Sequence, residues 1–540
     1  MNSQLHVLLK LREAEYTENR LGHIPQEGEE KMQTITEMLE SNARYEPDRI
    51  AVIFEEQRIT YKELNKEINK LANGLVRMGL KRGEVVMTLI PNSIRFIITH
   101  FALIRAGVTV IPLNVMYTPH EITYIGQDSG ASTIVANADL WAGNVSVKAA
   151  LPALNNVIIS KGQAGKGEIT LDSLVTNIET APAVASELDD IVSVIYTSGT
   201  TGRPKGATQT HRSILSNVMG CCTRNKFTRE DHLVCGLPMY NNFALSVVIM
   251  SAFYTAATLV AVDRFDARKV LDAIKEHGGT YFGGTPTMYS YFLHEYKEGH
   301  DDVSTLRAVN SGGAHCAGEI IRQVEKTFGA THMEGYGQTE GCGFTTLNPY
   351  VGVRKENSAG PPISNCLLKI VDDDDNELPV GKTGEITIKG DCFSIHGYLN
   401  RPEVNADVYR GGWFHSGDLG YLDKDGYLYV VDRKQDLIIT GGQNIYPAEV
   451  EEELYTHPKV ALAAVIGIPD TDKGELAKAY IVLKKGQTAT EKEIIDYVRT
   501  RIAKFKAPRL VEFVESLPQG PTGKILKREL REMVKKKQDA

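Results

Sequence analysis

Residues 196–206 combine hydroxyl, glycine and basic residues in a pattern that suits polyphosphate binding. The stretch reads YTSGTTGRPKG and follows an apolar, β-branched run, Ile191 to Tyr196, which predicts a strand. A strand leading into such a loop brings backbone N–H groups, hydroxyls and a positive charge close together. The candidate phosphate ligands are Thr197, Ser198, Gly199, Thr200, Thr201, Gly202 and Lys205.

Two other interpretations of this loop need to be weighed. Gly/Ser/Thr clusters are usually plain surface turns, so composition alone does not define a ligand site. The P-loop of NTPases requires G-x-x-x-x-G-K-[ST], whereas here Gly206 follows Lys205. The stretch is therefore a phosphate-loop candidate that is not a Walker A motif.

The loop closely resembles the signature of the AMP-forming acyl-adenylating superfamily, which includes acyl-CoA synthetases, adenylation domains and firefly luciferase. Further resemblances follow in the family's order, from about residue 34 to 530. They are GLPMYNNFAL (236–245), FGGTPTMY (282–289), SGGAHCAG (311–318), EGYGQTEGCG (334–343), the long run 411–451 that begins GGWFHSGDLG, and LPQGPTGKILKREL (517–530). The chain is most similar to the acyl-CoA synthetase or fatty-acid–CoA ligase branch.

The resemblance implies an ATP site and assigns roles within it. Tyr336 would lie against the adenine, Asp418 and Arg433 would contact the ribose, and Glu340 would bind Mg²⁺, which commonly takes one carboxylate plus substrate phosphates. The nucleotide-binding set adds to the loop residues Gly313, Ala314, Glu334, Gly335, Tyr336, Gly337, Gln338, Thr339, Asp418, Arg433 and Lys524. The catalytic set is Lys205, Thr339, Glu340 and Lys524, with Glu340 as the metal ligand.

The same resemblance places an acyl pocket at Asn241, Phe243, Phe282, Gly312 and Cys342, with Gly335 beside them. Asn241 stands where the family usually has His and where amino-acid-activating members carry Asp. A neutral Asn cannot pair with an ammonium group, which argues against an α-amino acid substrate. Asn241 as an ordinary turn residue is an equally good interpretation. His315, where the family usually has Pro, is interpreted as a structural substitution.

The implied reaction has two halves. A carboxylate, already ionised at pH 7, attacks the α-phosphate of ATP and gives acyl-AMP and pyrophosphate, with Lys524 neutralising charge. The small domain then rotates about a hinge at Gln435 and presents a pantetheine tunnel at Gly441 and Gly442. The thiol of coenzyme A finally takes the acyl group and releases AMP.

Alternating helical and strand-like segments predict an α/β fold with a mainly parallel sheet. A capping box at Thr60 to Glu63 starts a predicted helix that ends before Gly79. We expect an N-terminal extension (1–33), an AMP-binding domain (34–434) of two layered α/β subdomains with a small β-rich subdomain, and a mobile α+β C-terminal domain (435–540). A length of 540 residues agrees with several domains.

The net charge of -8 and the absence of zinc-ligand spacing argue against nucleic-acid binding. Seven scattered cysteines, no signal peptide and no long apolar run predict a cytoplasmic protein without an integral membrane segment. The expected partners are a small carboxylic acid and coenzyme A; a homodimer is left open. Two alternatives to a fatty-acid–CoA ligase remain: a stand-alone enzyme that loads an aryl or acyl group onto a carrier protein, and a catalytically inactive acyl- or nucleotide-binding protein.

Overall fold

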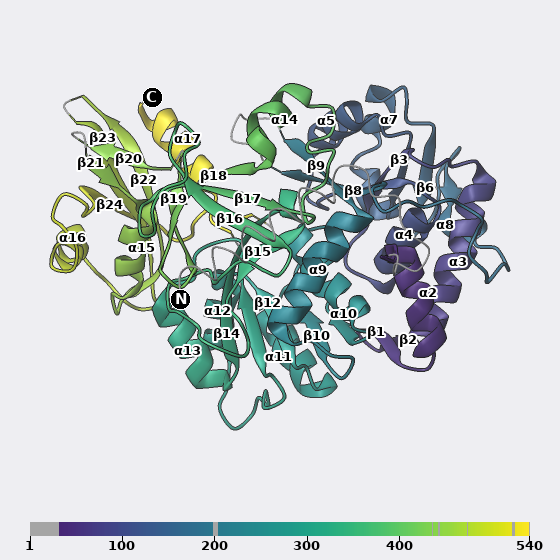
Figure 1. The fold of residues 1–540 in the computed structure, drawn as a ribbon, viewed down its shortest axis with the longest axis horizontal. Helices are drawn as coiled ribbons and strands as arrows, with labels where there is room; N and C mark the ends of the chain where they lie inside the picture. The colour runs from purple at the N-terminus through teal and green to yellow at the C-terminus, as the bar shows by residue number, and fades with distance from the viewer. Residues whose placement is uncertain are drawn as a thin grey trace, which may run out of the picture. The chain divides into compact units, whose positions relative to one another are not determined.

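The computed structural model describes residues 32–197, 204–434, 436–440, 443–471, 473–520 and 524–538, and Thr34–Ala540 forms one compact unit. The described residues form four β-sheets with helices packed around them (Figure 1). The architecture is mixed α/β, with a large N-terminal domain and a small C-terminal domain, as predicted. Among these residues no helix has the length and apolar character needed to cross a bilayer.

The first sheet has seven strands in the order β7-β6-β5-β3-β4-β8-β9. All neighbours are parallel except β8 and β9, which form the antiparallel pair on either side of the phosphate-loop candidate. Buried apolar side chains such as Met87, Ile111, Ile134 and Trp141 form its core. The strands are β3 (Val85–Leu89), β4 (Thr109–Pro112), β5 (Thr133–Ala136), β6 (Asn156–Ile159), β7 (Ile169–Thr170), β8 (Ile191–Thr197) and β9 (Lys205–Thr210).

The second sheet has eight strands in the order β15-β14-β13-β12-β10-β11-β1-β2. Its central strands are parallel, so their carboxyl ends lie along one edge. In α/β sheets ligands bind at this edge. The strands are β1 (Ile50–Phe54), β2 (Gln57–Thr60), β10 (His232–Cys235), β11 (Thr258–Ala261), β12 (Tyr281–Gly284), β13 (Ala308–Ser311), β14 (Thr331–Gln338) and β15 (Gly343–Leu347).

Helices surround these two sheets. The predicted capping box is present: the Thr60 hydroxyl accepts from Glu63 N at the start of α3, and the helix ends at Gly79 with φ 104°. The helices are α2 (Ile35–Tyr45), α3 (Tyr61–Met78), α4 (Ile94–Arg105), α5 (Pro119–Ser129), α6 (Ala138–Ala142), α7 (Ser146–Ala150), α8 (Leu171–Leu174), α9 (His211–Asn225), α10 (Met250–Tyr254), α11 (Ala267–His277), α12 (Pro286–Glu295) and α13 (Gly318–Phe328). A π-helical segment, η1 (Phe243–Ile249), and a 3₁₀ turn, η2 (Thr339–Gly341), lie among them.

A third, antiparallel sheet forms the β-rich subdomain expected from the sequence. Its strands are β16 (Cys366–Val371), β17 (Gly384–Gly390), β18 (Phe414–Leu422) and β19 (Leu428–Arg433), and α14 (Pro402–Val408) and η3 (Arg410–Gly412) precede β18. The acidic run Asp372 to Asp375 lies between the antiparallel strands β16 and β17, at an exposed hairpin tip.

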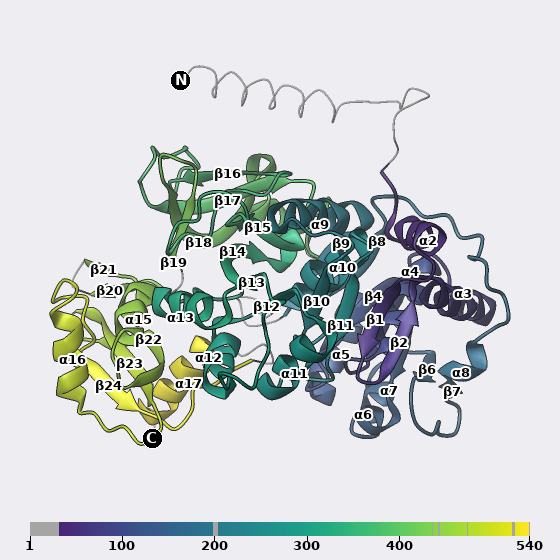
Figure 2. The ribbon, with the colours of Figure 1, turned by 90° about the horizontal axis from the view of Figure 1, so that it is seen from below.

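The C-terminal residues form the fourth sheet, in the order β21-β20-β23-β22 with β24 beside β23. Buried side chains such as Ile438, Val465, Ile481 and Val498 give it a core of its own. In Figure 2 its helix α15 lies next to α13 of the large domain. The elements are β20 (Ile438–Thr440), β21 (Gln443–Ile445), α15 (Pro447–Tyr455), β22 (Val460–Asp470), β23 (Gly474–Leu483), α16 (Glu491–Arg499), β24 (Leu510–Phe513) and α17 (Lys527–Gln538).

Candidate active site

Asp418 is the centre of the predicted ribose contact. It lies on β18 directly opposite Arg433 on β19, and Arg433 Nε is 3.5 Å from Asp418 Oδ1. The Tyr336 hydroxyl, from β14 of a different sheet, donates a hydrogen bond of 2.7 Å to Asp418 Oδ2. Burial raises the pKa of Asp418, and Arg433 and the Tyr336 bond partly offset that effect. The three side chains predicted to contact the nucleoside, those of Tyr336, Asp418 and Arg433, thus lie together.

The turn that carries Asp418 is fixed by its own backbone partners. Ser416 Oγ donates to the Ile386 carbonyl at 2.6 Å and accepts from Asp418 N at 3.1 Å. A fixed main chain lowers the number of orientations that the Asp418 carboxylate can adopt. This is the kind of preorganisation that a binding carboxylate requires.

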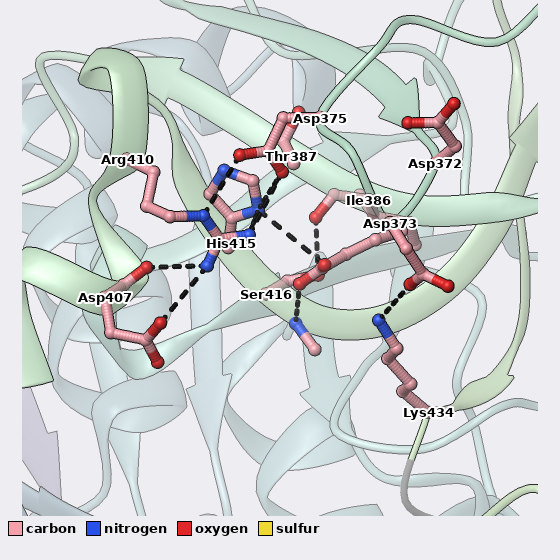
Figure 3. A network of polar contacts seen from close by, with 12 residues as sticks. Asp372, Asp373, Asp375, Ile386, Thr387, Asp407, Arg410, His415, Ser416 and Lys434 are labelled. Carbon is pink, nitrogen blue, oxygen red and sulfur yellow. Dashed lines mark hydrogen bonds and ion pairs between the residues drawn. The ribbon is translucent and has the colours of Figure 1, made fainter.

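The acidic hairpin tip contacts basic residues next to β18 and β19 (Figure 3). Asp375 forms a two-pronged pair with Arg410, with both oxygen-to-nitrogen distances 3.1 Å, and Arg410 donates to His415 Nδ1 at 2.9 Å. Asp373 pairs with Lys434 at 2.7 Å, two residues beyond Asp432 on β19. The tip is therefore bonded to Arg410, which precedes β18, and to Lys434, which follows β19.

Glu340, the predicted magnesium ligand, is a half-buried carboxylate in the turn η2. The Tyr398 hydroxyl donates to Glu340 Oε1. Burial raises the pKa of Glu340, and the Tyr398 bond opposes that shift. Within the described residues no Lys or Arg forms an ion pair with this carboxylate. A half-buried carboxylate oriented by a hydroxyl and without a cationic partner suits a divalent cation.

Tyr398 also contacts the phosphate-loop end of β9. Lys205 Nζ lies 5.5 Å from the centre of the Tyr398 ring. The chain around Tyr398 pairs with β9, since Leu399 N donates to the Gly206 carbonyl at 2.8 Å and Ala207 bridges Tyr398. The ring consequently stands between the predicted phosphate lysine and the predicted metal ligand.

Pro204, at the described C-terminal end of the phosphate loop, is bonded to α5. Tyr124 donates to the Pro204 carbonyl at 2.9 Å. Thr197 pairs with Lys205 across β8 and β9, which closes the base of the loop. Five of the predicted loop ligands, Ser198, Gly199, Thr200, Thr201 and Gly202, lie outside the described residues.

Lys524 extends from the C-terminal domain into this site. Gly520 N donates to the Lys524 carbonyl at 2.8 Å, and Gln519 bridges Ile525, so the backbone of Lys524 is paired with Gly520. Burial and the nearby Arg433 lower the pKa of Lys524 to about 8, while Asp418 counteracts them. Lys524 is therefore within electrostatic range of both predicted ribose residues.

The residues predicted to lie on the adenine side are on β14 and in the loop after β13. Gly337 is required by packing, because a Cβ there would lie 1.8 Å from the Gly343 carbonyl oxygen of β15. Glu334 is buried and accepts from Cys316 N at 3.0 Å. Gly313 has φ 82° and open space around it, and Ala314 follows it on the surface. Gln338 ends β14, and Thr339 begins η2.

Two aromatic rings and three glycines define the apolar part of the predicted acyl pocket. The Phe243 and Phe344 rings meet edge to face with centroids 5.2 Å apart. Added Cβ atoms at Gly312 and Gly335 would lie 2.7 and 2.6 Å from Phe344. A Cβ at Gly283 would lie 3.3 Å from Phe243. The missing Cβ atoms therefore let the two rings pack directly against the backbone of these glycines.

The other predicted pocket residues have different surroundings. Asn241 Oδ1 accepts from Phe243 N at 3.0 Å, so this side chain also serves the turn that opens η1. Phe282 is fully buried and packs against Phe292, with centroids 4.7 Å apart, on the face of β12 opposite Gly283. Cys342 is buried, with Sγ 3.3 Å from Ser213 Oγ. Gln435, Gly441 and Gly442, the predicted hinge and tunnel residues, lie outside the described residues.

Some residues of the site lie outside the family motifs, and their sequence context does not indicate a function. Tyr398 lies in HGYLN, which carries no chemistry by composition, and Phe344 follows the EGYGQTEGCG motif as an ordinary strand residue. Gln209 donates to Asn242 Oδ1 at 2.6 Å and to the Thr339 carbonyl at 3.2 Å, which ties β9 to η2. Only long-range pairing brings these residues to the site.

Comparison with known proteins defines the class that this fold and site represent. Residues 39–399 match the AMP-binding enzyme family, and residues 449–524 match the AMP-binding enzyme C-terminal domain. The chain belongs to this family of AMP-binding enzymes. Its enzyme class is that of the AMP-forming acid–thiol ligases, as the sequence predicts.

Among its relatives is a long-chain-fatty-acid–CoA ligase of Bacillus subtilis, which is 34% identical over 539 residues, covering 94% of this chain and 96% of the relative. A feruloyl-CoA synthase of an Amycolatopsis species is 35% identical over 491 residues, covering 91% and 96%. A solved structure, o-succinylbenzoate coenzyme A synthetase from Bacillus subtilis in complex with ATP and magnesium ion, has a TM-score of 0.80 and 30% identity, covering 91% of this chain and 98% of that one. These relatives differ in the acid that their names give.

Proposed function

We propose that the protein converts an apolar carboxylic acid, a fatty acid first among the candidates, into its acyl-CoA through an acyl-AMP intermediate. The observation that carries the proposal is the position of Lys524. A lysine from the small domain lies in electrostatic range of Asp418 and Arg433 in the large domain. That arrangement suits neutralisation of charge between an incoming carboxylate and the α-phosphate.

In the first half-reaction the chain's residues align ATP and the acid. Asp418 accepts the ribose hydroxyls, Tyr336 keeps that carboxylate in place, and Lys205 faces the phosphates. Glu340 is the residue that would hold Mg²⁺, which when bound neutralises phosphate charge. The carboxylate oxygen of the acid attacks the α-phosphorus, the bond to the pyrophosphate breaks, and Lys524 stabilises the charge that develops.

In the second half-reaction the small domain turns and withdraws Lys524. The thiolate of coenzyme A attacks the acyl carbonyl carbon, the bond to AMP breaks, and AMP leaves. This proposal includes Gln435 as the hinge, and Gly441 and Gly442 as residues of the pantetheine tunnel. It also includes the domain boundary between residues 434 and 435.

Apolar walls favour an apolar acid. Phe243, Phe344 and the adjoining glycines present no charge to a bound acyl group. Asn241 is neutral, so it offers no counter-ion to an ammonium group. A fatty acid suits this uncharged environment, and an aryl acid is the second candidate.

An acid panel tests the proposal. Purified protein is incubated with MgATP and fatty acids of graded length, or with cinnamic and benzoic acids, and acid-dependent ATP–pyrophosphate exchange is measured without coenzyme A. Steady AMP release is then measured with coenzyme A and, separately, with a phosphopantetheinylated carrier protein. Exchange with a fatty acid and release that requires coenzyme A support the proposal. Release that requires the carrier protein supports the carrier-loading alternative, and no exchange with any acid favours an inactive binding protein.

A further inference from the structure

His315 lies between carboxylates of the two domains. Its Nδ1 is 3.1 Å from Glu334 Oε1 on β14, and its Nε2 is 3.0 Å from Glu452 Oε2 on α15. Burial disfavours the charged ring, but the two carboxylates outweigh it and raise the pKa of His315 to about 10. The ring is thus an imidazolium that donates one hydrogen bond to each domain.

The second oxygen of Glu452 binds the start of a helix in the other domain. Gly318 N, the first residue of the eleven-residue helix α13, donates to Glu452 Oε1 at 3.0 Å. The first turn of a helix has unsatisfied N–H groups and a partial positive charge, both of which favour a carboxylate. In the structure α13 has no side-chain cap of its own. Glu452 supplies that cap across the domain boundary.

A second contact joins α15 to the large domain. Ala448 N, in the first turn of α15 and one turn before Glu452, donates to Asp432 Oδ2 at 3.0 Å. Two separated contacts fix the orientation of a helix better than one does, and in this orientation Lys524 lies near Asp418.

We propose that His315 and Glu452 are positioning residues that hold the small domain in the orientation for acyl-AMP formation. The contact must break when the small domain turns, because Glu452 moves with α15 while His315 and Gly318 stay with the large domain. The inference rests on the proposed two-step function. The inference gives His315 a role, whereas the family usually has proline at this position. A proline ring has no hydrogen-bond donor and could not form these contacts.

The test compares the two half-reactions in variants of the pair. His315→Ala and Glu452→Ala are each assayed for acyl-AMP formation in single turnover, and for conversion of supplied acyl-AMP and coenzyme A into acyl-CoA. We expect acyl-AMP formation to fall about tenfold, the scale of losing a hydrogen bond to a charged group. Conversion of supplied acyl-AMP should stay equal to wild type or rise, and this second activity also shows that each variant is folded.

A neighbouring residue provides the matched control. Glu453 is next to Glu452 on α15 but pairs with Arg501 inside the small domain, with Oε2 3.0 Å from Nε. Glu453→Ala should leave both half-reactions unchanged. The double variant His315→Ala/Glu452→Ala should be no slower in acyl-AMP formation than Glu452→Ala alone, because the two side chains act through one contact.

Three outcomes overturn the inference: unchanged acyl-AMP formation in both single variants, equal losses in both half-reactions, or the same selective loss in Glu453→Ala. A failure of the proposed function looks different, because then the wild-type protein itself forms no acyl-AMP with any acid of the panel.

Discussion

Tyr336 and Asp418 are joined by a hydrogen bond of 2.7 Å that links two sheets, from the end of β14 to the middle of β18. The bond connects the residue predicted to lie against the adenine with the carboxylate predicted to take the ribose hydroxyls. The residues predicted to contact the two halves of a nucleoside therefore hold each other in place.

Tyr336→Phe tests this link. Loss of the hydroxyl leaves Asp418 with one fewer donor, so we expect the KM for ATP to rise roughly tenfold with little change in kcat. ATP–pyrophosphate exchange measured over a range of ATP concentrations gives both constants. Tyr429→Phe is the control, since Tyr429 stacks on Tyr421 away from the site at a centroid distance of 4.9 Å. An unchanged KM in Tyr336→Phe would show that the bond plays no part in nucleotide binding.

Tyr398→Phe addresses the orientation of Glu340. Without the hydroxyl, the carboxylate loses the partner that fixes it, and we expect the concentration of Mg²⁺ needed for half-maximal exchange to rise several-fold. Titration of Mg²⁺ at saturating ATP and acid measures this. Tyr409→Phe, which keeps its ring against Phe414, should match wild type. Equal Mg²⁺ dependence in Tyr398→Phe and wild type would contradict the assignment.

Lys524→Ala should slow acyl-AMP formation by about 10²–10³, the scale for removing one preorganised charge contact. Conversion of supplied acyl-AMP to acyl-CoA should persist, because Lys524 has left the site by then. Rapid-quench measurement of each half-reaction separates the two. Similar decreases in the rates of both half-reactions would refute the claim that Lys524 acts only in the first domain orientation.

The pH dependence of the first half-reaction follows from the same lysine. Burial and Arg433 lower the pKa of Lys524 from its ordinary 10.5 to about 8, so the cationic form predominates below about pH 8 and is lost as the pH rises through that value. We expect kcat/KM for acyl-AMP formation to decline above about pH 8, since this ratio reports on the free enzyme. Lys524→Arg, which stays charged, should lack this decline. An identical alkaline decline in Lys524→Arg would assign it to another group.

Gly312→Ala probes the acyl pocket. The new Cβ would lie 2.7 Å from Phe344, so that ring must shift. We expect the KM for the acid to rise at least several-fold, more for bulky than for short acids, while the KM for ATP changes little. Gly279→Ala, in which the Cβ meets Val234 outside the site at 2.6 Å, is the control for a general packing defect. A selective rise in the KM for ATP would move Gly312 out of the acyl pocket.

The fold was largely predictable because local signals agreed with it. The capping box at Thr60, the left-handed stop at Gly79 and the apolar strand before the phosphate loop all appear as expected. The motifs also identified residues that the structure brings together, such as Asp418, Arg433 and Tyr336.

Long-range contacts were not predictable from the sequence. Tyr398 reaches Glu340 only because its segment pairs with β9, which is about two hundred residues earlier in the chain. Likewise, nothing in the sequence around His315 indicates that Glu452, 137 residues away, meets it from another domain. Such contacts depend on tertiary packing, which periodicity and propensity do not specify.

One single-turnover experiment tests the central claim most directly. The protein is mixed with MgATP labelled at the α-phosphate and a fatty acid that supports exchange, without coenzyme A, and coenzyme A is added after a delay. We predict enzyme-bound acyl-AMP before the addition, and one AMP with one acyl-CoA per site after it. Formation of labelled ADP, or the absence of acyl-AMP before coenzyme A is added, would contradict a mechanism that proceeds through a bound acyl-adenylate.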